Sequence, residues 1–272
     1  MKNILEEIIA HKKKEVEEYK KSESIEEMKN RIDYYKTSVT VSKKQFDFKK
    51  SLKSNKINVI AEIKKASPSA GVIIDDYNPF FVAQKYFDSG PPSCFSILTD
   101  QKYFGGNFHD ITLVKTGIDI PILCKDFFID PYQVYKAKTA SADAILIILA
   151  AVSQQTAEEL YSVSEDLGMN TIVEVHNTEE ATQALKFKKA IIGINNRNLK
   201  TLETNIQTTY DLHKILKNHQ GPIVCESGIK SEKEVEEIVK KTKINNFLIG
   251  ESLLKDLDKN SSLLKRIVQI KP

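Results

Sequence analysis

Charged and amide side chains close several apolar runs of this chain, where a buried segment would ordinarily continue with another apolar residue. The clearest case is the run from residue 60 to residue 64. Because a strand has a period of two, Glu62 and Lys64 would lie on one face of it, and an acid beside a base can move protons on a bound molecule. Further runs end in the same way, with Lys125, Glu174, Asn195, Arg197 and Glu226.

Two glycine-containing turns indicate an anion site. Ser227 and Gly228 precede a stretch with helix-start signals, and Gly250 and Glu251 follow the last apolar run. Glycine lets backbone N–H groups approach a phosphate, and helix N-termini favour anions. A tight turn that needs a small residue is the alternative interpretation of each. Since the Glu251 carboxylate would repel a phosphate, we expect its backbone N–H to face the anion and its side chain to turn away.

From residue 58 onward, short β-branched runs alternate with longer amphipathic stretches, which is the pattern of βα units on a parallel sheet. The predicted strands are Val59–Ile63, Cys94–Leu98, Pro121–Lys125, Ala142–Ile148, Thr171–Val175, Ala190–Ile194, Ile223–Glu226 and Asn246–Ile249. The predicted helices are Pro79–Ser89, Phe108–Thr116, Pro131–Thr139, Thr156–Leu167, Thr178–Phe187, Thr204–Leu216, Ser231–Lys241 and Ser261–Gln269.

Eight strands with intervening helices predict an α/β fold, a single (β/α)8 TIM barrel with an N-terminal helical extension. The 272 residues are close to the roughly 250 that such a barrel needs. We assign residues 1–50 to the extension and residues 51–272 to the catalytic barrel. A doubly wound open sheet would use the same alternation, but the strand count favours the barrel. In a barrel the carboxyl ends of all strands meet at one face, which would gather the charged residues there.

The charge balance gives no reason to expect a nucleic-acid partner, since 40 Lys and Arg nearly cancel 37 Asp and Glu and leave a net charge of +3. The longest apolar run, residues 144 to 152, is far shorter than the roughly 20 residues that cross a bilayer, so no membrane partner is expected. The first ten residues lack a secretory signal pattern. We expect a cytoplasmic monomer or weak homo-oligomer.

The cysteines and histidines predict no metal site. Cys94, Cys124 and Cys225 are widely spaced and form no Cys-x-x-Cys motif, which also argues against a disulfide framework. The five histidines show no close metal-ligand pairing, and we expect them in ordinary surface or packing roles.

Residues 4–35 carry apolar side chains at helical spacing, which predicts helices. Lys13 and Glu17 stand four residues apart, as an exposed ion pair on a helix would. Because the signs of charge alternate from Lys12 to Glu18, we expect this run to be a solvated helix face without chemistry of its own.

The segment from Ile60 to Ser69 resembles the signature of the indole-3-glycerol-phosphate synthase family. Other segments resemble that family's strand-end motifs in the same order along the chain. They are Leu98–Asp100 with Phe104–Gly106, Pro121–Phe127, Val173–Val175, Gly193–Leu199, Glu226–Ile229 and Leu248–Gly250. The resemblance covers about residue 46 to residue 254, and the N-terminal helices resemble the family's extension, which packs over the barrel mouth.

The resemblance implies ring closure of 1-(2-carboxyphenylamino)-1-deoxyribulose 5-phosphate to indole-3-glycerol phosphate in tryptophan biosynthesis, with loss of carbon dioxide and water and no cofactor. It makes Lys125 the general acid at the carbonyl, with a pKa lowered by burial and by nearby Lys64. Glu174 would be the base or the group that stabilises developing positive charge. Lys64 would contact the carboxylate or phosphate and could act as an acid. Glu62 would position Lys64 or handle the later proton, and Asn195 would hydrogen-bond near the reacting centre.

The resemblance also implies the binding residues. Ser67 would lie near the substrate carboxylate, and Arg197 would order the rim. Glu226 is placed with them as a supporting group. Phe104, Phe127 and Leu199 would offer apolar surface to the aromatic ring. The phosphate would be held by Ser227, Gly228, Gly250 and Glu251 through backbone N–H groups, together with Lys64.

The chain departs from the family pattern at three places. Ala70 stands where many members carry a cation in the loop after the first strand, which indicates weaker loop closure. Pro91 and Pro92 precede the second strand where small residues are frequent. Ser141 takes the place of a common glycine before the fourth strand.

Two other classes of function are alternatives. The first is another phosphate-binding barrel of the same pathway, such as phosphoribosylanthranilate isomerase or the tryptophan synthase α chain. An isomerase of that type would need a cysteine where Glu62 and Lys64 stand. The second is a non-catalytic ligand-binding barrel, which the complete set of reacting groups disfavours.

Overall fold

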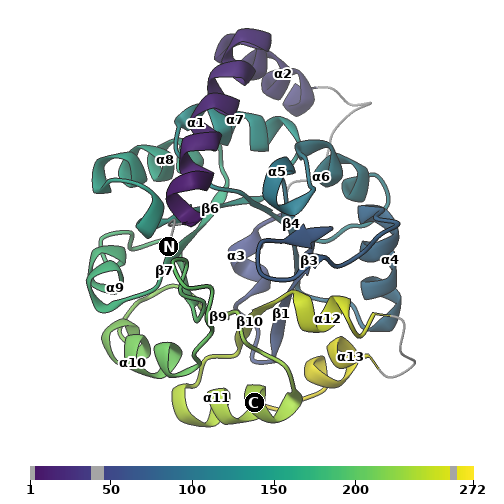
Figure 1. The fold of residues 1–272 in the computed structure, drawn as a ribbon, viewed down its shortest axis with the longest axis vertical. Coiled ribbons are helices and arrows are strands. Elements are labelled where there is room, and N and C mark those ends of the chain that lie inside the picture. Colours follow the sequence, from purple (N-terminus) through teal and green to yellow (C-terminus); the bar gives the residue numbers. More distant parts are fainter. Residues whose placement is uncertain (1–3, 38–45, 258–261) are drawn as a thin grey trace.

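Eight parallel strands close into a barrel surrounded by helices (Figure 1). The computed structural model describes residues 4–37, 46–257 and 262–272. Around the barrel the strand order is β1-β10-β9-β8-β7-β6-β5-β4, and β4 pairs with β1. The strands are β1 Asn58–Ile63, β4 Cys94–Leu98, β5 Ile122–Lys125, β6 Ala144–Ile148, β7 Asn170–Val175, β8 Ile191–Asn195, β9 Ile223–Glu226 and β10 Asn246–Ile249. The predicted barrel is therefore confirmed, and the open-sheet alternative is wrong.

The predicted strands agree with these bounds to within two residues at either end. The differences arise because backbone pairing, and not apolar character, decides where a strand begins and ends. Pro121, for example, lies outside β5, since proline has no N–H to give to a ladder.

The outer helices are α4 Pro79–Ser89, α6 Phe108–Lys115, α7 Pro131–Thr139, α8 Gln154–Asp166, α9 Thr178–Ala184, α10 Gln207–Leu216, α11 Glu232–Thr242 and α13 Leu263–Val268. Their start signals act as predicted. Asp130 accepts a hydrogen bond from the Tyr132 N–H, and Ser231 forms a capping box with Glu234. The predicted first residue of the last helix, Ser261, lies outside the described residues. Among those described, no helix combines the length and apolar character that crossing a bilayer requires.

Several short elements were not predicted, because each is too short for a periodic pattern. Those at the carboxyl ends of barrel strands are a hairpin of β2 Ala66–Ser67 and β3 Gly71–Val72, the helices α5 Gln101–Phe104 and α12 Glu251–Leu254, and the 3-10 helix η1 Leu149–Ala151. The short helix α3 Phe48–Ser51 precedes the first barrel strand.

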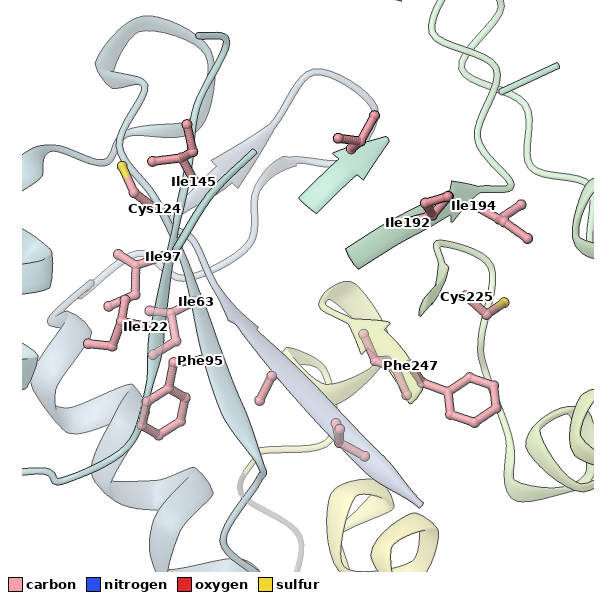
Figure 2. Packing of buried hydrophobic residues seen from close by; sticks show 14 of the residues in the cluster. Ile63, Phe95, Ile97, Ile122, Cys124, Ile145, Ile192, Ile194, Cys225 and Phe247 are labelled. Atoms are coloured by element: carbon pink, nitrogen blue, oxygen red, sulfur yellow. The ribbon is translucent and has the colours of Figure 1, made fainter. Parts of the chain in front are cut away.

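Alternate residues of each strand divide the apolar side chains into two cores. One set packs outward against the helices, and Figure 2 shows Ile63, Phe95, Ile97 and Phe247 among its members. The other set fills the barrel and includes Ile60, Leu123, Ile172, Val224 and Leu248. Two residues further along four of these strands, on the same inward face, stand Glu62, Lys125, Glu174 and Glu226.

The N-terminal helices are α1 Ile4–Ser22, α2 Ile25–Thr37 and α3 Phe48–Ser51. Figure 1 shows α1 running across the barrel from the side of α7 toward β7. Leu5 and Ile8 of α1 and Phe48 of α3 belong to the inner core. The Lys49 N–H donates a hydrogen bond to Asn170 Oδ1 at the start of β7, so α3 lies at the amino-terminal ends of the strands. The inner core is thus covered at both ends.

The expectation of a solvated face from Lys12 to Glu18 is wrong at Lys12. This side chain is fully buried, and its Nζ lies 2.9 Å from Asp100 Oδ2 and 2.8 Å from Asp126 Oδ1. Burial opposes its charge, but Asp126 and Asp100 together raise the Lys12 pKa above its ordinary value. The alternation of charge gave no sign of this, because the two partners are remote in sequence.

Ser141 has a φ of 72°, in the left-handed region that favours glycine. It follows α7 directly after Ala140, whose φ of −75° is ordinary. The departure from the family's glycine therefore leaves a strained residue at this turn.

We predict that Ser141→Gly raises the free energy of unfolding by about 0.5–1 kcal/mol, because the relieved left-handed strain exceeds the entropy that glycine adds to the unfolded chain. Urea denaturation would measure the change. Ala140→Gly is the matched control and should lower stability. An unchanged or lower stability of Ser141→Gly would contradict the strain.

Candidate active site

A cavity of about 350 Å³ opens at the carboxyl ends of the strands. Its walls contain all but one of the predicted site residues. Those that line it are Glu62, Lys64, Ser67, Phe104, Lys125, Phe127, Glu174, Asn195, Arg197, Leu199, Ser227, Gly228, Gly250 and Glu251. The barrel therefore brings together residues spread over most of the chain.

Ionised groups of both signs meet at the bottom of this cavity. Lys64 and Glu62 form an ion pair, as the period of two predicted. Lys125 Nζ lies 3.5 Å from Glu62 Oε2 and 3.2 Å from Glu226 Oε2. Burial opposes the charge of Glu62, but Lys64 and Lys125 outweigh it and lower the pKa of that carboxyl.

The expectation of a lowered pKa for Lys125 is wrong. Burial by itself would lower this pKa, but Glu226, Glu62 and Glu174 together raise it above the ordinary value of lysine. The lowered pKa was predicted from Lys64 alone, because the carboxylates around Lys125 come from other strands. Lys125 is therefore held as an ammonium beside these carboxylates and is a weaker acid than a free lysine.

Glu174 is almost completely buried at the end of β7. Its Oε1 accepts a hydrogen bond from Asn195 Nδ2 at 3.0 Å and lies 3.1 Å from His176 Nε2. Although burial opposes its charge, His176 and Lys125 bring the pKa of Glu174 down to about 2. His176 was expected in an ordinary packing or surface role, and no sequence pattern indicated its contact with Glu174.

Glu226 was placed among the substrate-binding residues, and its position corrects this. The side chain is fully buried and does not line the cavity. It lies beneath the wall, where a Cβ on Gly193 would come within 2.0 Å of its Oε1. Burial raises its pKa to about 8, and Lys125 only partly offsets this. Glu226 supports Lys125 from behind.

Gly250 makes room for the Glu62 carboxylate on the neighbouring strand. A Cβ at this position would meet Glu62 Oε1 at 2.3 Å. Any side chain here would displace Glu62, so this glycine is required for the acid-base cluster and not only for an anion-binding turn.

Both glycine-containing turns lie at one rim of the cavity. Ser227 and Gly228 have φ values of 64° and 83°, so successive residues adopt the left-handed conformation. The Glu251 carboxylate pairs with Lys255 Nζ at 2.5 Å, which partly neutralises it. A second cation, Lys230, also lines this part of the wall. Such a rim suits an anionic group.

Part of the cavity lining is apolar. Phe104 and Phe127 lie with ring centroids 6.3 Å apart, and Leu199 packs against the same inner core. Helix α1 adds Ile4, Leu5 and Ile8, which sequence analysis did not place in the site. Their helical spacing predicted a buried face but gave no sign of what it covers.

Arg197 and Ser67 shape the rim through local hydrogen bonds. The Arg197 guanidinium donates to the Leu202 carbonyl at 3.0 Å, and its backbone N–H donates to Asn195 Oδ1. Ser67 Oγ accepts from the Ala70 N–H at 3.2 Å inside the β2–β3 hairpin. Both residues face the cavity, and their contacts with a ligand stay predictions.

Within the described ranges, no group of three or more His, Cys, Asp or Glu side chains has an arrangement that could hold a metal ion. That the site works without a metal or cofactor stays a prediction.

A closed barrel with a buried acid-base cluster, an apolar wall and an anion-suited rim at the strand ends defines the class as a phosphate-binding (β/α)8-barrel enzyme. The chain matches the family model described as "Indole-3-glycerol phosphate synthase" over residues 5–265. It therefore belongs to the indole-3-glycerol phosphate synthase family, and the resemblance seen in the strand-end motifs is confirmed.

Relatives of that name align over nearly the whole chain. The protein from Prochlorococcus marinus (strain MIT 9515) is 40% identical over 271 residues, which cover 97% of this chain and 89% of the relative. The protein from Polynucleobacter necessarius subsp. necessarius (strain STIR1) is 38% identical over 265 residues, which cover 97% of this chain and 98% of the relative.

Solved structures show the same fold at low identity. The tryptophan synthase complex from Pyrococcus furiosus matches with a TM-score of 0.58 and 15% identity, over 79% of this chain and 97% of the matched chain. The tryptophan synthase alpha chain from Legionella pneumophila subsp. pneumophila matches with a TM-score of 0.58 and 13% identity, over 88% and 96% of the two chains. This likeness concerns the barrel alone.

Proposed function

We propose that this chain closes the indole ring of 1-(2-carboxyphenylamino)-1-deoxyribulose 5-phosphate to give indole-3-glycerol phosphate, carbon dioxide and water. The observation that carries the proposal is the charged Lys125 ammonium, held by Glu62 and Glu226 at the bottom of a cavity lined by apolar side chains and by several cations. Family membership supports the same activity. The alternatives of an isomerase and a non-catalytic barrel lack a supporting observation of this kind.

The acid step belongs to Lys125. As the aromatic carbon attacks the carbonyl, the oxygen gains negative charge, and an ammonium within hydrogen-bond reach stabilises it and gives it a proton. The raised pKa of Lys125 keeps the proton in place until that charge develops. The proposed acid therefore works by electrostatic stabilisation as much as by acidity.

The other polar and charged residues would bind the substrate carboxylate, accept the later proton and position the reacting groups. Lys64, next to Ser67, would hold the substrate carboxylate until carbon dioxide leaves. Glu62 would take the later proton, because its contacts with both lysines place it between them. Asn195 would fix the Glu174 carboxylate through their hydrogen bond at 3.0 Å. Glu226 would hold Lys125 in place.

The substrate would lie across the cavity with its ring on one wall and its phosphate on the other. Phe104, Phe127 and Leu199 offer the ring an apolar surface. The phosphate would bind the backbone N–H groups of the turns at Ser227, Gly228, Gly250 and Glu251, with Lys64 nearby. Arg197 would order the rim between the two.

The domain bounds, the oligomeric state and the cellular compartment are also proposals. We assign residues 1–50 to an extension packing on the barrel, in which α1 would close the mouth, and residues 51–272 to the catalytic barrel. The protein would work as a cytoplasmic monomer or weak homo-oligomer without nucleic acid. Three buried cysteines without disulfides support a reducing compartment.

Lys125→Met should lower kcat by roughly 10²- to 10⁴-fold with little change in KM, because the variant loses a general acid and leaves the binding walls intact. Indole fluorescence would follow product formation. Lys13→Met, on the exposed face of α1, is the control and should keep wild-type rates. A folded Lys125→Met protein with kcat within threefold of wild type would remove Lys125 from the acid role.

Ser227→Asp should raise KM by at least about tenfold, because it adds a negative charge at the phosphate turn. Asp and Asn both tolerate the left-handed backbone at this position. Ser227→Asn is therefore the matched control and should change KM only slightly. Equal KM values for the two variants would show that the substrate phosphate does not bind at this turn.

A further inference from the structure

His176 is a titratable residue that contacts Glu174 but has no role in the function proposed above. It follows β7, two residues beyond Glu174, and the period of two keeps both side chains on the same side. It is mostly buried and does not line the cavity. It can act on a substrate only through Glu174.

A second carboxylate fixes the orientation of the His176 ring. Glu180 Oε2 accepts a hydrogen bond from the His176 backbone N–H at 2.7 Å and lies 3.0 Å from its Nδ1. Asn177, the N-cap of α9, in turn donates to Glu180 Oε1 at 2.6 Å. With Nδ1 held by Glu180, Nε2 faces Glu174.

The contact between His176 and Glu174 is an ion pair more than a directed hydrogen bond. Nε2 lies 3.1 Å from Glu174 Oε1, but its N–H is not aligned for a hydrogen bond. Asn195 already donates to the same oxygen. The contact therefore acts through charge, and its effect depends on whether the ring is protonated.

The ion pairs at the bottom of the cavity leave Glu174 to His176. Lys64 pairs with Glu62, and Lys125 lies close to Glu62 and Glu226. Facing Glu174 itself are Lys125 from β5, Glu226 from β9 and His176. The groups facing the ring are Glu174 and Glu180. A protonated His176 therefore gives Glu174 its ion-pair partner.

We propose that His176, oriented by Glu180, is a positioning residue whose positive charge keeps Glu174 an anion throughout the reaction. Glu174 then stabilises positive charge that builds on the substrate, in place of acting as a base. This rests on the function proposed above and decides between the two roles left open for Glu174. Burial opposes a protonated His176, but Glu174 and Glu180 outweigh it and raise the pKa of His176 to about 10.

The test is the pH dependence of kcat from about pH 5 to pH 9 in three variants. His176→Gln keeps a side-chain N–H but loses the charge, so the pKa of Glu174 should rise. We expect its kcat to fall at least about tenfold between pH 8 and pH 6 relative to wild type, with KM changed less than about threefold. His176→Lys restores the charge and should bring the acid limb back toward that of wild type. Glu179→Gln, on the exposed side of α9, is the control and should match wild type.

A His176→Gln profile with an unshifted acid limb overturns the proposal, whether kcat is unchanged or lowered equally at every pH. The second measurement needs no variant. Nitrogen chemical shifts of the His176 ring in the wild-type protein should show both nitrogens protonated at pH 7.5, and a neutral ring there also overturns the proposal. An inactive wild-type protein would contradict the proposed activity instead, and the nitrogen shifts would still decide the charge of His176.

Discussion

The structure depends on the placement of opposite charges in a buried layer at one end of the barrel. Glu62, Glu174 and Glu226 lose most of their contact with water, which would be unfavourable for isolated carboxylates. Lys125 is shared among them, and its contacts with Glu62 and Glu226 offset part of that loss. The same arrangement leaves a charged ammonium facing a cavity, so the requirement of stability and the requirement of chemistry are met by one set of contacts.

The barrel satisfies this constraint through the alternation of its strands. Every second residue points inward, so the apolar layer that contains Leu123 and Val224 is followed directly by the layer that contains Lys125 and Glu226. Gly193 and Gly250 leave the space that the carboxylates occupy. Helix α1 adds apolar side chains to the cavity lining. Its buried Lys12 holds the helix in place through ion pairs with Asp100 and Asp126.

Much of the fold and most of the site could be predicted from local pattern. Strand periodicity paired Glu62 with Lys64, and polar strand ends located Lys125 and Glu174. Contacts between distant segments could not be predicted in this way. Lys12 was taken for a surface residue because Asp100 and Asp126 are far away in sequence, and the Lys125 pKa was assigned the wrong direction because its three carboxylates come from other strands. Glu226 was placed among the substrate-binding residues, as a supporting group, because a strand end does not reveal the depth of its side chain.

The measurement that tests the central claim most directly follows carbon dioxide release and indole fluorescence together, after purified protein is mixed with the carboxyphenylamino-deoxyribulose phosphate in the presence of a chelator. We predict that both products appear at the same rate and in equal amounts, because one charged cluster would carry the decarboxylation and the dehydration of each substrate molecule. Consumption of substrate without carbon dioxide, or binding of substrate without turnover, would contradict it.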